Sequence, residues 1–313
     1  MTVTVFIDGG HGTTGLEIRE RLAGRDDVAL IELDEARRRD EATRRDALHA
    51  ADIAILCLPD GAAREAVALA GDSAVRIIDA STAHRVDPAW VYGFPEMEAD
   101  QAERIASARR VANPGCYALA FIALVRPLVR AGLLAPGTPL SVNATSGFSG
   151  GGKAMIEEFE SGAAATGFRN YALGLTHKHL PEMRVHAGLD AAPLFSPSVA
   201  NVYRGMIVEV PIVRSMLAGA PSAHDLRALI AVHYACRGAV RVLDSDGTEQ
   251  LETLAIERCA GLDRLEIMIF SSPDGGQLRL CAALDNLGKG AAGSAIQNLN
   301  LMVGLDMLSG LRL

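Results

Sequence analysis

The feature that most constrains the fold is an alternation of short β-branched runs with helical stretches in the first third of the chain. The strand-like runs occupy residues 3–7, 28–33, 51–58 and 75–81, and the helical stretches occupy 15–22 and 62–69. Such alternation is typical of βαβ units, in which helices cover a parallel sheet. We therefore expect an α/β amino-terminal domain built on a Rossmann-type, doubly wound parallel sheet.

The first predicted strand runs directly into a glycine-rich turn and a helix, so this turn is a candidate phosphate-binding loop. Glycines let the backbone approach a pyrophosphate, and the amino end of the helix offers unpaired N–H groups. We expect a dinucleotide cofactor here; the alternative is a tight turn without a ligand. The candidate cofactor-binding residues of the loop are Gly9, Gly12, Thr13, Thr14 and Gly15.

The end of the second predicted strand bears on which nicotinamide cofactor is used. A carboxylate at this place is typical of NAD-binding folds, whereas arginine suits the 2′-phosphate of NADP. Asp34 keeps NAD open, but Arg37, Arg38 and Arg39 favour NADP, bound as NADPH. The alternative is that these arginines form a solvated helix face.

The chain changes character after Cys116, where longer strand-like stretches begin. These occupy residues 141–150, 201–213, 263–270 and 277–284, and helices are expected around 153–161 and 223–237. Period-two alternation at 205–213 is typical of a sheet with one covered face. We expect an α+β catalytic domain with a large mixed sheet that also serves dimerisation or higher oligomerisation.

The predicted domain boundaries follow from this change. Residues 1–115 and 290–313 are expected to form the NADP-binding domain, and 116–289 the catalytic and oligomerisation domain. The tail from Gly290 to Leu313 is amphipathic throughout. We expect it to form one long helix against the first domain.

Composition excludes several classes of function. A net charge of -8 without a basic stripe argues against nucleic acid as a partner. The amino end lacks the basic region of a signal peptide. The apolar segment 118–134 is interrupted by Arg126, Pro127 and Arg130, so we expect a buried helix and no membrane partner. Five cysteines without a CxxC pair fit a cytoplasmic location and no structural metal.

Cys116 is the candidate nucleophile. Pro114 and Gly115 stop any preceding element, and the apolar run that follows reads as a buried helix, so Cys116 lies at or just before a helix amino terminus. There the helix dipole and free N–H groups favour the thiolate and can hold an oxyanion. A thiolate beside a nicotinamide suggests attack on an activated carbonyl, loss of a leaving group and hydride transfer to a thioester.

The other thiols have no such signal and are expected to be inert, as buried cysteines usually are. Cys57 and Cys281 lie inside predicted strands, and Cys236 lies inside a predicted helix. Cys259 has no clear local pattern around it. Only Cys116 is therefore expected to react.

His177 and His179 are the candidate acid/base groups, since histidine titrates near neutral pH. Pro181 biases Leu180 toward extended backbone, so the two imidazoles are expected on one face of a strand or loop end. The pattern leaves open which histidine acts. Zinc ligation through the HxH pair and plain hydrogen-bonded surface histidines are the alternatives, and zinc would need further ligands.

Several segments are candidate grips for a substrate phosphate or carboxylate. Residues 146–152 carry glycines into a helix that begins near Lys153, although Ala154 breaks the spacing of a nucleotide loop. Arg204 is a further candidate cation. The candidate substrate-binding residues are Arg85, Ser146, Gly147, Lys153 and Arg184.

A second group of glycines, Gly288, Gly290 and Gly293, precedes the last predicted helix. Gly288 and Gly290 are candidates for a backbone clamp on the nicotinamide. The alternative is that these glycines serve close packing only.

Five motifs together resemble the shorter form of the N-acetyl-γ-glutamyl-phosphate reductases. They are GGHGTTGLE at 9–17, NPGCYA at 113–118, SGFSGGGK at 146–153, HKHLPE at 177–182 and DNLGKGAAGSAIQNLN at 285–300. The resemblance runs from Gly9 to about Asn300, and the cysteine and carboxyl-terminal motifs are the more specific. DASTAHR at 79–85 and the lysine at 153 depart from the longer members of the family.

The resemblance implies a function in arginine biosynthesis. N-acetyl-γ-glutamyl phosphate, an acyl phosphate, would be reduced by NADPH to N-acetylglutamate semialdehyde with release of phosphate, in a cytoplasmic homodimer or homotetramer. By the matched motifs, Cys116 is the nucleophile, His177 or His179 the acid/base group and Glu182 a residue that orients it. Ser81 is expected in the cofactor site.

Other functions compete with this interpretation. An aspartate-semialdehyde dehydrogenase would show an RVPVxxGH-like stretch, but the corresponding residues 201–210 contain no histidine. A glyceraldehyde-phosphate dehydrogenase would have threonines and asparagine after the cysteine, where this chain has Tyr117 and Ala118. The homologous reduction of N-acetyl-aminoadipyl phosphate, one methylene longer, stays open. A dinucleotide-binding sensor would need the glycine loop but no activated thiol.

Overall fold

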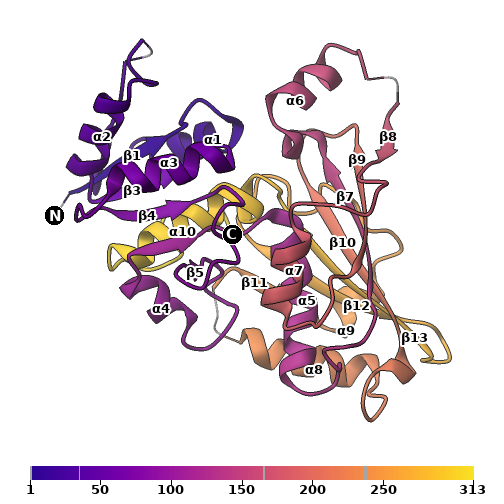
Figure 1. Ribbon diagram of the computed structural model, residues 1–313. Helices are drawn as coiled ribbons and strands as arrows, with labels where there is room; N and C mark the ends of the chain where they lie inside the picture. The colour runs from indigo at the N-terminus through magenta and orange to yellow at the C-terminus, as the bar shows by residue number, and fades with distance from the viewer. Residues whose placement is uncertain (1, 35, 165, 236–237) are drawn as a thin grey trace. The chain divides into compact units, whose positions relative to one another are not determined.

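The computed structural model describes residues 2–34, 36–164, 166–235 and 238–313 (Figure 1). They divide into two compact units. Unit 1 comprises residues 1–114 and 291–311, and unit 2 comprises 115–290 and 312–313. Over the described ranges, no helix combines the length and the apolar character needed to cross a membrane.

Unit 1 contains a parallel sheet with the strand order β2-β1-β3-β4-β6-β5. Its strands are β1 (Val3–Asp8), β2 (Val28–Ile31), β3 (Ile53–Leu56), β4 (Arg76–Asp79), β5 (Val91–Tyr92) and β6 (Arg110–Ala112). Its helices are α1 (Thr13–Leu22), α2 (Glu41–Ala50), α3 (Asp60–Ala70), α4 (Gln101–Ser107) and α10 (Gly293–Met302). The predicted doubly wound α/β fold is confirmed.

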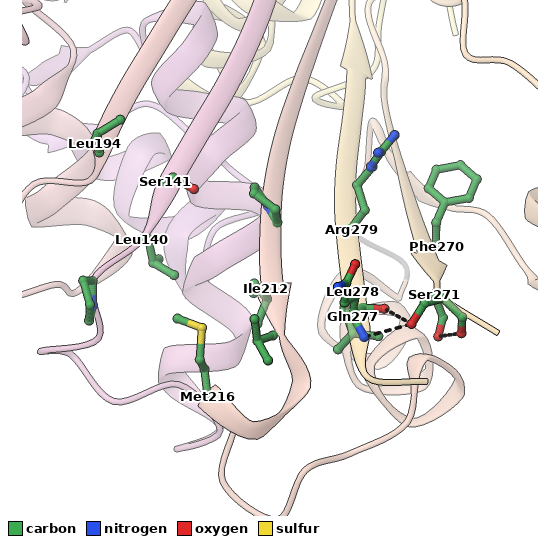
Figure 2. Close-up of a pocket in the computed structure, with 14 residues that line it drawn as sticks. Leu140, Ser141, Leu194, Ile212, Met216, Phe270, Ser271, Gln277, Leu278 and Arg279 are labelled. Carbon is green, nitrogen blue, oxygen red and sulfur yellow. Dashed lines mark hydrogen bonds between the residues drawn. The ribbon is translucent and has the colours of Figure 1, made fainter. Parts of the chain in front are cut away.

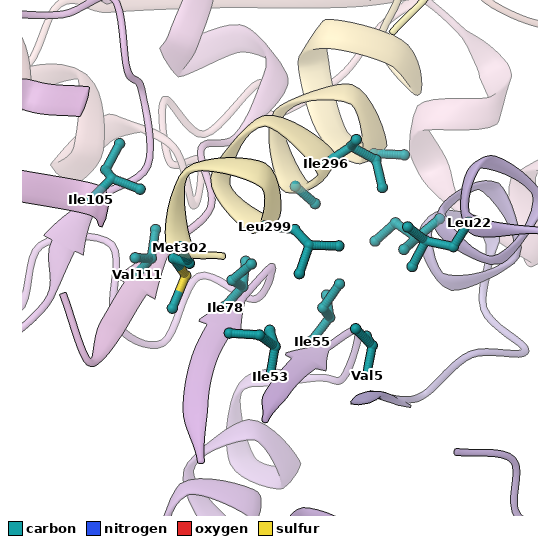
Figure 3. Close-up of a cluster of buried hydrophobic side chains, with 13 residues drawn as sticks. Val5, Leu22, Ile53, Ile55, Ile78, Ile105, Val111, Ile296, Leu299 and Met302 are labelled. Atoms are coloured by element: carbon teal, nitrogen blue, oxygen red, sulfur yellow. The ribbon is translucent and has the colours of Figure 1, made fainter. Parts of the chain in front are cut away.

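Alternate residues of the central strands feed two separate cores, one on each face of the sheet. Val5, Ile55 and Ile78 pack with α1, α4 and α10 (Figure 3), whereas Phe6 and Leu56 pack with α2 and α3. Each fully buried leucine or isoleucine in such a core contributes on the order of 1.5–3 kcal/mol. Near-continuous apolar strands are therefore required, and the sequence supplies them.

The order of the strands creates a topological switch point beside β1. The chain moves from β1 to β2 on one side and then crosses to β3 on the other. The loops after β1 and β3 therefore diverge at the carboxyl edge of the sheet, where open α/β sheets bind their ligands. The glycine loop follows β1 at this place, and Cys57 follows β3.

The prediction of one long helix from Gly290 to Leu313 is wrong. A π-helical turn, η3 (Gly288–Ala292), precedes α10, and α10 ends at Met302. Gly304 adopts a positive φ of 78°, a conformation that ends helices, and the side chain of Asn300 donates to the carbonyl of Ser309. The tail is thus folded back in turns after one short helix.

Unit 2 is built on a mixed sheet with the order β11-β12-β13-β10-β7-β9-β8. Its strands are β7 (Ser141–Gly147), β8 (Phe168–Asn170), β9 (Leu194–Ala200), β10 (Met206–Val213), β11 (Val240–Val242), β12 (Leu265–Ser271) and β13 (Gln277–Leu284). Its helices are α5 (Cys116–Arg130), α6 (Lys153–Glu160), α7 (Leu180–Ala187), α8 (Ala223–Tyr234), α9 (Ser245–Glu249) and the 3₁₀ turns η1 (Phe148–Gly151) and η2 (Arg214–Met216). The predicted α+β domain with a large mixed sheet is confirmed.

The sheet of unit 2 has one covered face, as its alternation predicts. Along β10, Val208, Val210 and Ile212 are buried, whereas Glu209, Pro211 and Val213 are more exposed. Helix α5 packs on the covered side with α7 and α8 (Figure 1). Because α5 is apolar on nearly every side, it is buried along most of its length.

Pro127 lies inside α5 and removes the N–H that would otherwise bond the carbonyl of Ala123. The hydroxyl of Tyr234 donates to this carbonyl instead, at 3.0 Å. The bond ties α8 to α5 and replaces the missing backbone bond. A proline in the predicted helix is thus compatible with an intact, buried helix.

Two predicted strands of unit 2 are shorter than expected. The strand expected at 141–150 ends at Gly147, where η1 begins, and the strand expected at 201–213 begins only at Met206. The cause is a local exchange of hydrogen bonds: the N–H groups of Phe148 and Ser149 bond the carbonyls of Val202 and Tyr203. The two segments form a paired turn in place of longer strands.

Candidate active site

The glycine loop after β1 is packed so closely that side chains are excluded. Gly9 has a φ of 85°, and a Cβ there would overlap the carbonyl of Cys57. A Cβ on Gly15 would lie 2.6 Å from the carbonyl oxygen of Gly9. Gly12 is the N-cap of α1 and donates its N–H to Gly9, and no side chain caps the helix. This bare backbone cradle at a helix amino end fits the pyrophosphate of a dinucleotide.

Thr13, Thr14 and Gly15 form the first turn of α1, where the N–H groups have no partner within the helix. Ser81 lies just after β4, at the same carboxyl edge of the sheet. Its backbone N–H and its hydroxyl both donate to the buried carboxylate of Asp79, at 2.9 and 2.7 Å. The loop that carries Ser81 is thereby fixed beside the switch point.

The predicted cofactor-selecting residues lie on an exposed turn between β2 and α2. The carbonyl of Asp34 accepts the N–H groups of Arg37 and Arg38, and the guanidinium of Arg37 donates to Thr43 at 2.8 Å. The side chains of Asp34, Arg37 and Arg39 are exposed. Arginine therefore lies on the turn that follows β2, where a 2′-phosphate would bind.

Cys116 is the first residue of α5 and is partly exposed. Gly115 is the N-cap, and no side chain caps the first turn. The N–H of Gly115 donates to the carboxylate of Glu182 at 2.7 Å, and Glu182 is only 1 % exposed. Glu182 thus fixes the peptide immediately before the thiol, at a first turn whose N–H groups have no partner within the helix.

Gly290 lies against Cys116. A Cβ on Gly290 would be 2.7 Å from the Cβ of Cys116, and the N–H of Gly290 donates to the carbonyl of Asp285. Gly288 is equally constrained, because a Cβ there would overlap the carbonyl of Leu262. Close packing within unit 2 accounts for both glycines by itself.

The prediction that Leu180 is extended before Pro181 is wrong. His179 is the N-cap of α7 and Leu180 its first residue, with Pro181 in the first turn. Proline suits this place, because the N–H groups of a first turn have no helical partner. The two histidines therefore lie in the turn that enters a helix, one turn before Glu182.

His177 and His179 nevertheless lie side by side. The Nδ1 atom of His177 accepts the backbone N–H of His179 at 3.1 Å, so a neutral His177 carries its proton on Nε2. The two rings are 4.8 Å apart. The ring of Tyr117, the residue after the cysteine, lies 5.8 and 5.9 Å from them.

A pair of tyrosines adjoins this group. The hydroxyl of Tyr171 donates to that of Tyr117 at 3.0 Å, and Tyr117 donates to the carbonyl of Ser198. Burial raises the pKa of Tyr171 to about 12, and it also raises the pKa of Tyr117 well above its ordinary value. Both phenols are therefore neutral in the physiological range.

Three other thiols differ from Cys116 in their surroundings. Desolvation, with the nearby carboxylates of Asp79 and Asp8, raises the pKa of Cys57 to about 12. Burial likewise raises the pKa of Cys259 to about 12 and that of Cys281 further. Cys57 follows β3 instead of lying inside it, and Cys236 falls outside the described residues.

The predicted anion grips lie on different elements and differ in exposure. Lys153 begins α6 and Arg184 lies on α7, and both are exposed. Arg85 belongs to unit 1 and is buried, where it donates to the carbonyls of Asn113 and Ala80. Ser146 is buried at the end of β7 with Gly147. A side-chain hydrogen bond between Ser146 and Tyr117 lowers the pKa of Tyr117, against the larger effect of burial.

No group of three or more metal-ligating side chains forms within the described residues. A surface hollow of about 770 Å³ lies at one end of the sheet of unit 2 (Figure 2). Leu140, Ile212, Met216 and Phe270 line it, and the described lining residues include no cysteine, histidine or carboxylate. The hollow therefore offers hydroxyl groups and a guanidinium, but among its described lining residues no thiol and no histidine or carboxylate that could act as a general base.

Three residues of unit 2 that take part in these contacts had no role predicted from the sequence: Tyr171, Asp285 and Asn286. Tyr171 has no local signal, because its partner Tyr117 is 54 residues earlier in the chain. Asp285 and Asn286 directly precede the glycines at 288 and 290, and this position could have drawn attention to them. The side chain of Asn286 bonds both Gly205 and Ser149, so it joins the two turns described above.

Comparison with protein families agrees with this architecture. Residues 23–105 match the model of a semialdehyde dehydrogenase NAD binding domain, and residues 116–286 match that of a semialdehyde dehydrogenase dimerisation domain. The solved structures of aspartate semialdehyde dehydrogenase II from Vibrio cholerae, complexed with ASA, and of aspartate semialdehyde dehydrogenase with NADP from Candida albicans share the fold. Their TM-scores are 0.72 and 0.65, at 15% and 13% identity, over 97% of this chain and 99% of each of theirs.

These features define a semialdehyde dehydrogenase: a parallel dinucleotide-binding sheet, and a mixed-sheet domain that begins at a helix-terminal cysteine. N-acetyl-gamma-glutamyl-phosphate reductases from Brucella ovis and Brucella canis are both 52% identical over 310 residues, which cover 97% of this chain and 100% of each relative. The chain belongs to the N-acetyl-gamma-glutamyl-phosphate reductase family. The predicted family is thereby confirmed.

Proposed function

We propose that this protein reduces N-acetyl-γ-glutamyl phosphate to N-acetylglutamate semialdehyde and phosphate, with NADPH, as a step of arginine biosynthesis. The names of relatives at 52% identity support the substrate. The observation that carries the chemistry is Cys116, a partly exposed thiol on the first residue of a buried helix whose N-cap is fixed by Glu182.

The thiolate of Cys116 attacks the acyl carbon, and the bond from that carbon to the phosphate oxygen breaks. This gives a thioester and free phosphate. NADPH, when bound, supplies the hydride that reduces the thioester. The first-turn amides of α5 stabilise negative charge on the carbonyl oxygen, and collapse of the resulting thiohemiacetal releases the aldehyde and the thiolate.

His179 is the acid/base group in this proposal, and His177 positions it. The Nδ1 atom of His177 is engaged with the backbone N–H of His179. His179 begins the helix that carries Glu182, and Glu182 holds the residue before the thiol. His179 takes the proton of Cys116 and gives it to the oxygen of the thiohemiacetal. It takes the same proton back when that hydroxyl collapses to the aldehyde and the thiolate leaves.

Unit 1 holds the cofactor in this proposal. The backbone of Gly9, Gly12 and Gly15 receives the pyrophosphate, with Thr13 and Thr14 in the first turn of α1 and Ser81 beside it. Arg37 and Arg38 receive the 2′-phosphate, which selects NADP. Gly290 packs against Cys116, so its proposed role is to leave room for the Cys116 side chain and so to fix the position of the thiol.

The remaining roles are also proposals. Ser146, Gly147, Lys153 and Arg184 adjoin the substrate, and Arg85 braces the loop after β4. The matched dimerisation domain supports a homodimer or homotetramer, and the biosynthetic role supports a cytoplasmic location.

The decisive test measures phosphate-dependent NADP⁺ reduction with three aldehydes: N-acetylglutamate semialdehyde, aspartate semialdehyde and the N-acetyl-aminoadipate homologue. We expect kcat/KM to be at least 100-fold higher for the first, and mass spectrometry of the quenched enzyme to find the acyl group on Cys116. A preference for another aldehyde refutes the substrate. Turnover without an acyl-enzyme refutes the covalent route.

A further inference from the structure

The connection between β9 and β10 places a cation, Arg204, beside the candidate active site of unit 2. The residues on both sides of it are held: the N–H of Ser149 donates to the carbonyl of Tyr203, and the N–H of Gly205 donates to the side chain of Asn286 at 2.9 Å. Gly205 has a φ of 112°, and a Cβ there would overlap the carbonyl of Ile256. The position of Arg204 is therefore fixed by backbone contacts that do not depend on its side chain.

The side chain of Arg204 is also positioned. Its guanidinium lies 3.3 Å from the carboxylate of Asp285 and 5.7 Å from the centre of the Tyr203 ring, and the side chain is 19 % exposed. Charge-assisted bonds of arginine to carboxylate usually measure about 2.7–2.9 Å. The pair with Asp285 is longer than this, and it gives the guanidinium a defined orientation.

Asp285 has other partners that satisfy its charge. One carboxylate oxygen accepts the N–H groups of Leu287 and Gly288 at 2.8 and 3.1 Å, and the other accepts that of Gly261 at 2.6 Å. Three backbone amides therefore compensate the buried carboxylate. Arg204 is not required for that purpose.

Asp285 also connects Arg204 to the thiol. Its carbonyl accepts the N–H of Gly290, and a Cβ on Gly290 would lie 3.0 Å from that carbonyl oxygen and 2.7 Å from the Cβ of Cys116. The residue that orients the guanidinium is thus one glycine away from the nucleophile. By contrast, Lys153 and Arg184 are exposed.

We propose that Arg204 binds an oxyanion of the substrate beside Cys116, either the phosphoryl group or the carboxylate. The proposal rests on the proposed function and adds a specificity residue to it. A planar guanidinium offers paired donors to either group, and a fixed orientation lowers the entropy lost on binding. The phosphoryl group and the carboxylate are distinguishable because they enter the reverse reaction on separate molecules.

The test measures phosphate-dependent oxidation of N-acetylglutamate semialdehyde by the wild type, Arg204→Lys and Arg204→Gln. We expect one KM to rise about 10-fold in Arg204→Lys and about 100-fold in Arg204→Gln, while the KM for NADP⁺ changes less than twofold. A rise for inorganic phosphate assigns the phosphoryl group. A rise for the aldehyde assigns the carboxylate. If both stay within twofold of the wild type, the proposal is wrong.

Arg264→Lys is the matched control. Arg264 has the same side-chain exposure of 19 % and pairs with the buried carboxylate of Glu266 instead of Asp285. Thermal unfolding of all variants separates loss of folding from loss of binding. If Arg204→Gln does not fold, Arg204→Lys alone decides by the same KM criterion.

A second measurement does not depend on the identity of the aldehyde. Inorganic phosphate or N-acetylglutamate should slow the alkylation of Cys116 by iodoacetamide in the wild type, and this protection should be lost in Arg204→Gln. Wild-type protein that fails to oxidise N-acetylglutamate semialdehyde but shows this pattern would refute the proposed substrate and keep the oxyanion site. Equal protection of both proteins, or protection of neither, would refute the site.

Discussion

The amino-terminal ends of α1 in unit 1 and of α5 in unit 2 are alike in their backbone. Each helix follows a glycine N-cap, Gly12 or Gly115, and neither first turn is capped by a side chain. A serine, threonine or aspartate is the preferred N-cap residue of a helix, because its side chain accepts a hydrogen bond from an N–H group of the first turn. Here both helix starts lack such a side-chain cap, and both carry the positive potential of a helix amino end.

The two helix starts differ in their first helical residue and in the group that accepts the N–H of the N-cap glycine. In α1 the first residue is Thr13, and the N–H of Gly12 bonds the backbone carbonyl of Gly9. In α5 the first residue is Cys116, and the N–H of Gly115 bonds the side chain of Glu182. In the proposed function, the same local geometry serves cofactor binding in one unit and covalent chemistry in the other, and the first side chain of the helix makes the difference.

The largest expected effect comes from removing the thiol. Cys116→Ser should lower kcat by roughly 10⁴-fold in both directions, because the hydroxyl is not ionised at this helix start. NADPH affinity, measured by fluorescence titration, should stay within twofold. Cys57→Ser is the control, and activity retained by Cys116→Ser would point to a dehydrogenase without a covalent step.

Gly15→Ala tests the start of α1. The new Cβ would lie 2.6 Å from the carbonyl oxygen of Gly9, which is backbone and cannot move freely. We expect the Kd for NADPH to rise about 100-fold, while alkylation of Cys116 keeps its rate. Gly61→Ala in α3 is the matched control, since nothing lies within 4 Å of a Cβ there. An unchanged Kd would mean that the loop does not hold the cofactor.

Gly290→Ala is the corresponding change beside α5. Its Cβ would lie 2.7 Å from the Cβ of Cys116 and displace the thiol. We expect kcat to fall about 30-fold and the rate of alkylation of Cys116 to differ from that of the wild type, while the Kd for NADPH stays within twofold of the wild-type value. Weaker NADPH binding with an unperturbed thiol would instead support a clamp on the nicotinamide.

Glu182→Gln tests the cap of α5, which alone of the two depends on a side chain. An amide oxygen can still accept the N–H of Gly115, but without charge assistance. We expect kcat to fall about 10-fold with little change in the Kd for NADPH. Glu182→Ala should also lower stability by about 1–3 kcal/mol, measured by denaturant unfolding, because it leaves a buried N–H unpaired. Normal kcat in both variants would exclude a positioning role for Glu182.

The fold was predictable from the sequence because its signals are local. Alternating apolar runs predict the parallel sheet, and the glycine pattern predicts the loop after β1. The start of α5 at Cys116 also followed from local residues, namely Pro114, Gly115 and the apolar run after them.

The parts that were missed depend on contacts between distant residues. The bond of Glu182 to Gly115 spans 67 positions, and that of Asn286 to Ser149 spans 137. The prediction of a long tail helix was wrong for a different reason. The backbone leaves the helical conformation near Gly304, which has a positive φ, although the amphipathic sequence pattern continues beyond it. The helical state of Leu180 shows that proline in a first helical turn outweighs its usual bias on the preceding residue.

The smallest expected effect comes from the tyrosine pair, which has no counterpart at α1. Tyr171→Phe removes one bond between neutral hydroxyl groups, worth about 0.5–1.5 kcal/mol, so we expect kcat to fall about 3- to 10-fold. Since burial raises the pKa of Tyr171 to about 12, the phenol stays protonated below about pH 11, and the pH profile of kcat between 6 and 9 should keep its shape. Tyr117→Phe should cost more, because the Tyr117 hydroxyl also donates to Ser198 in a buried setting. A shifted acidic limb in Tyr171→Phe would show instead that this hydroxyl tunes a group that titrates in catalysis, and α5 would then differ from α1 by a proton relay as well as by a thiol.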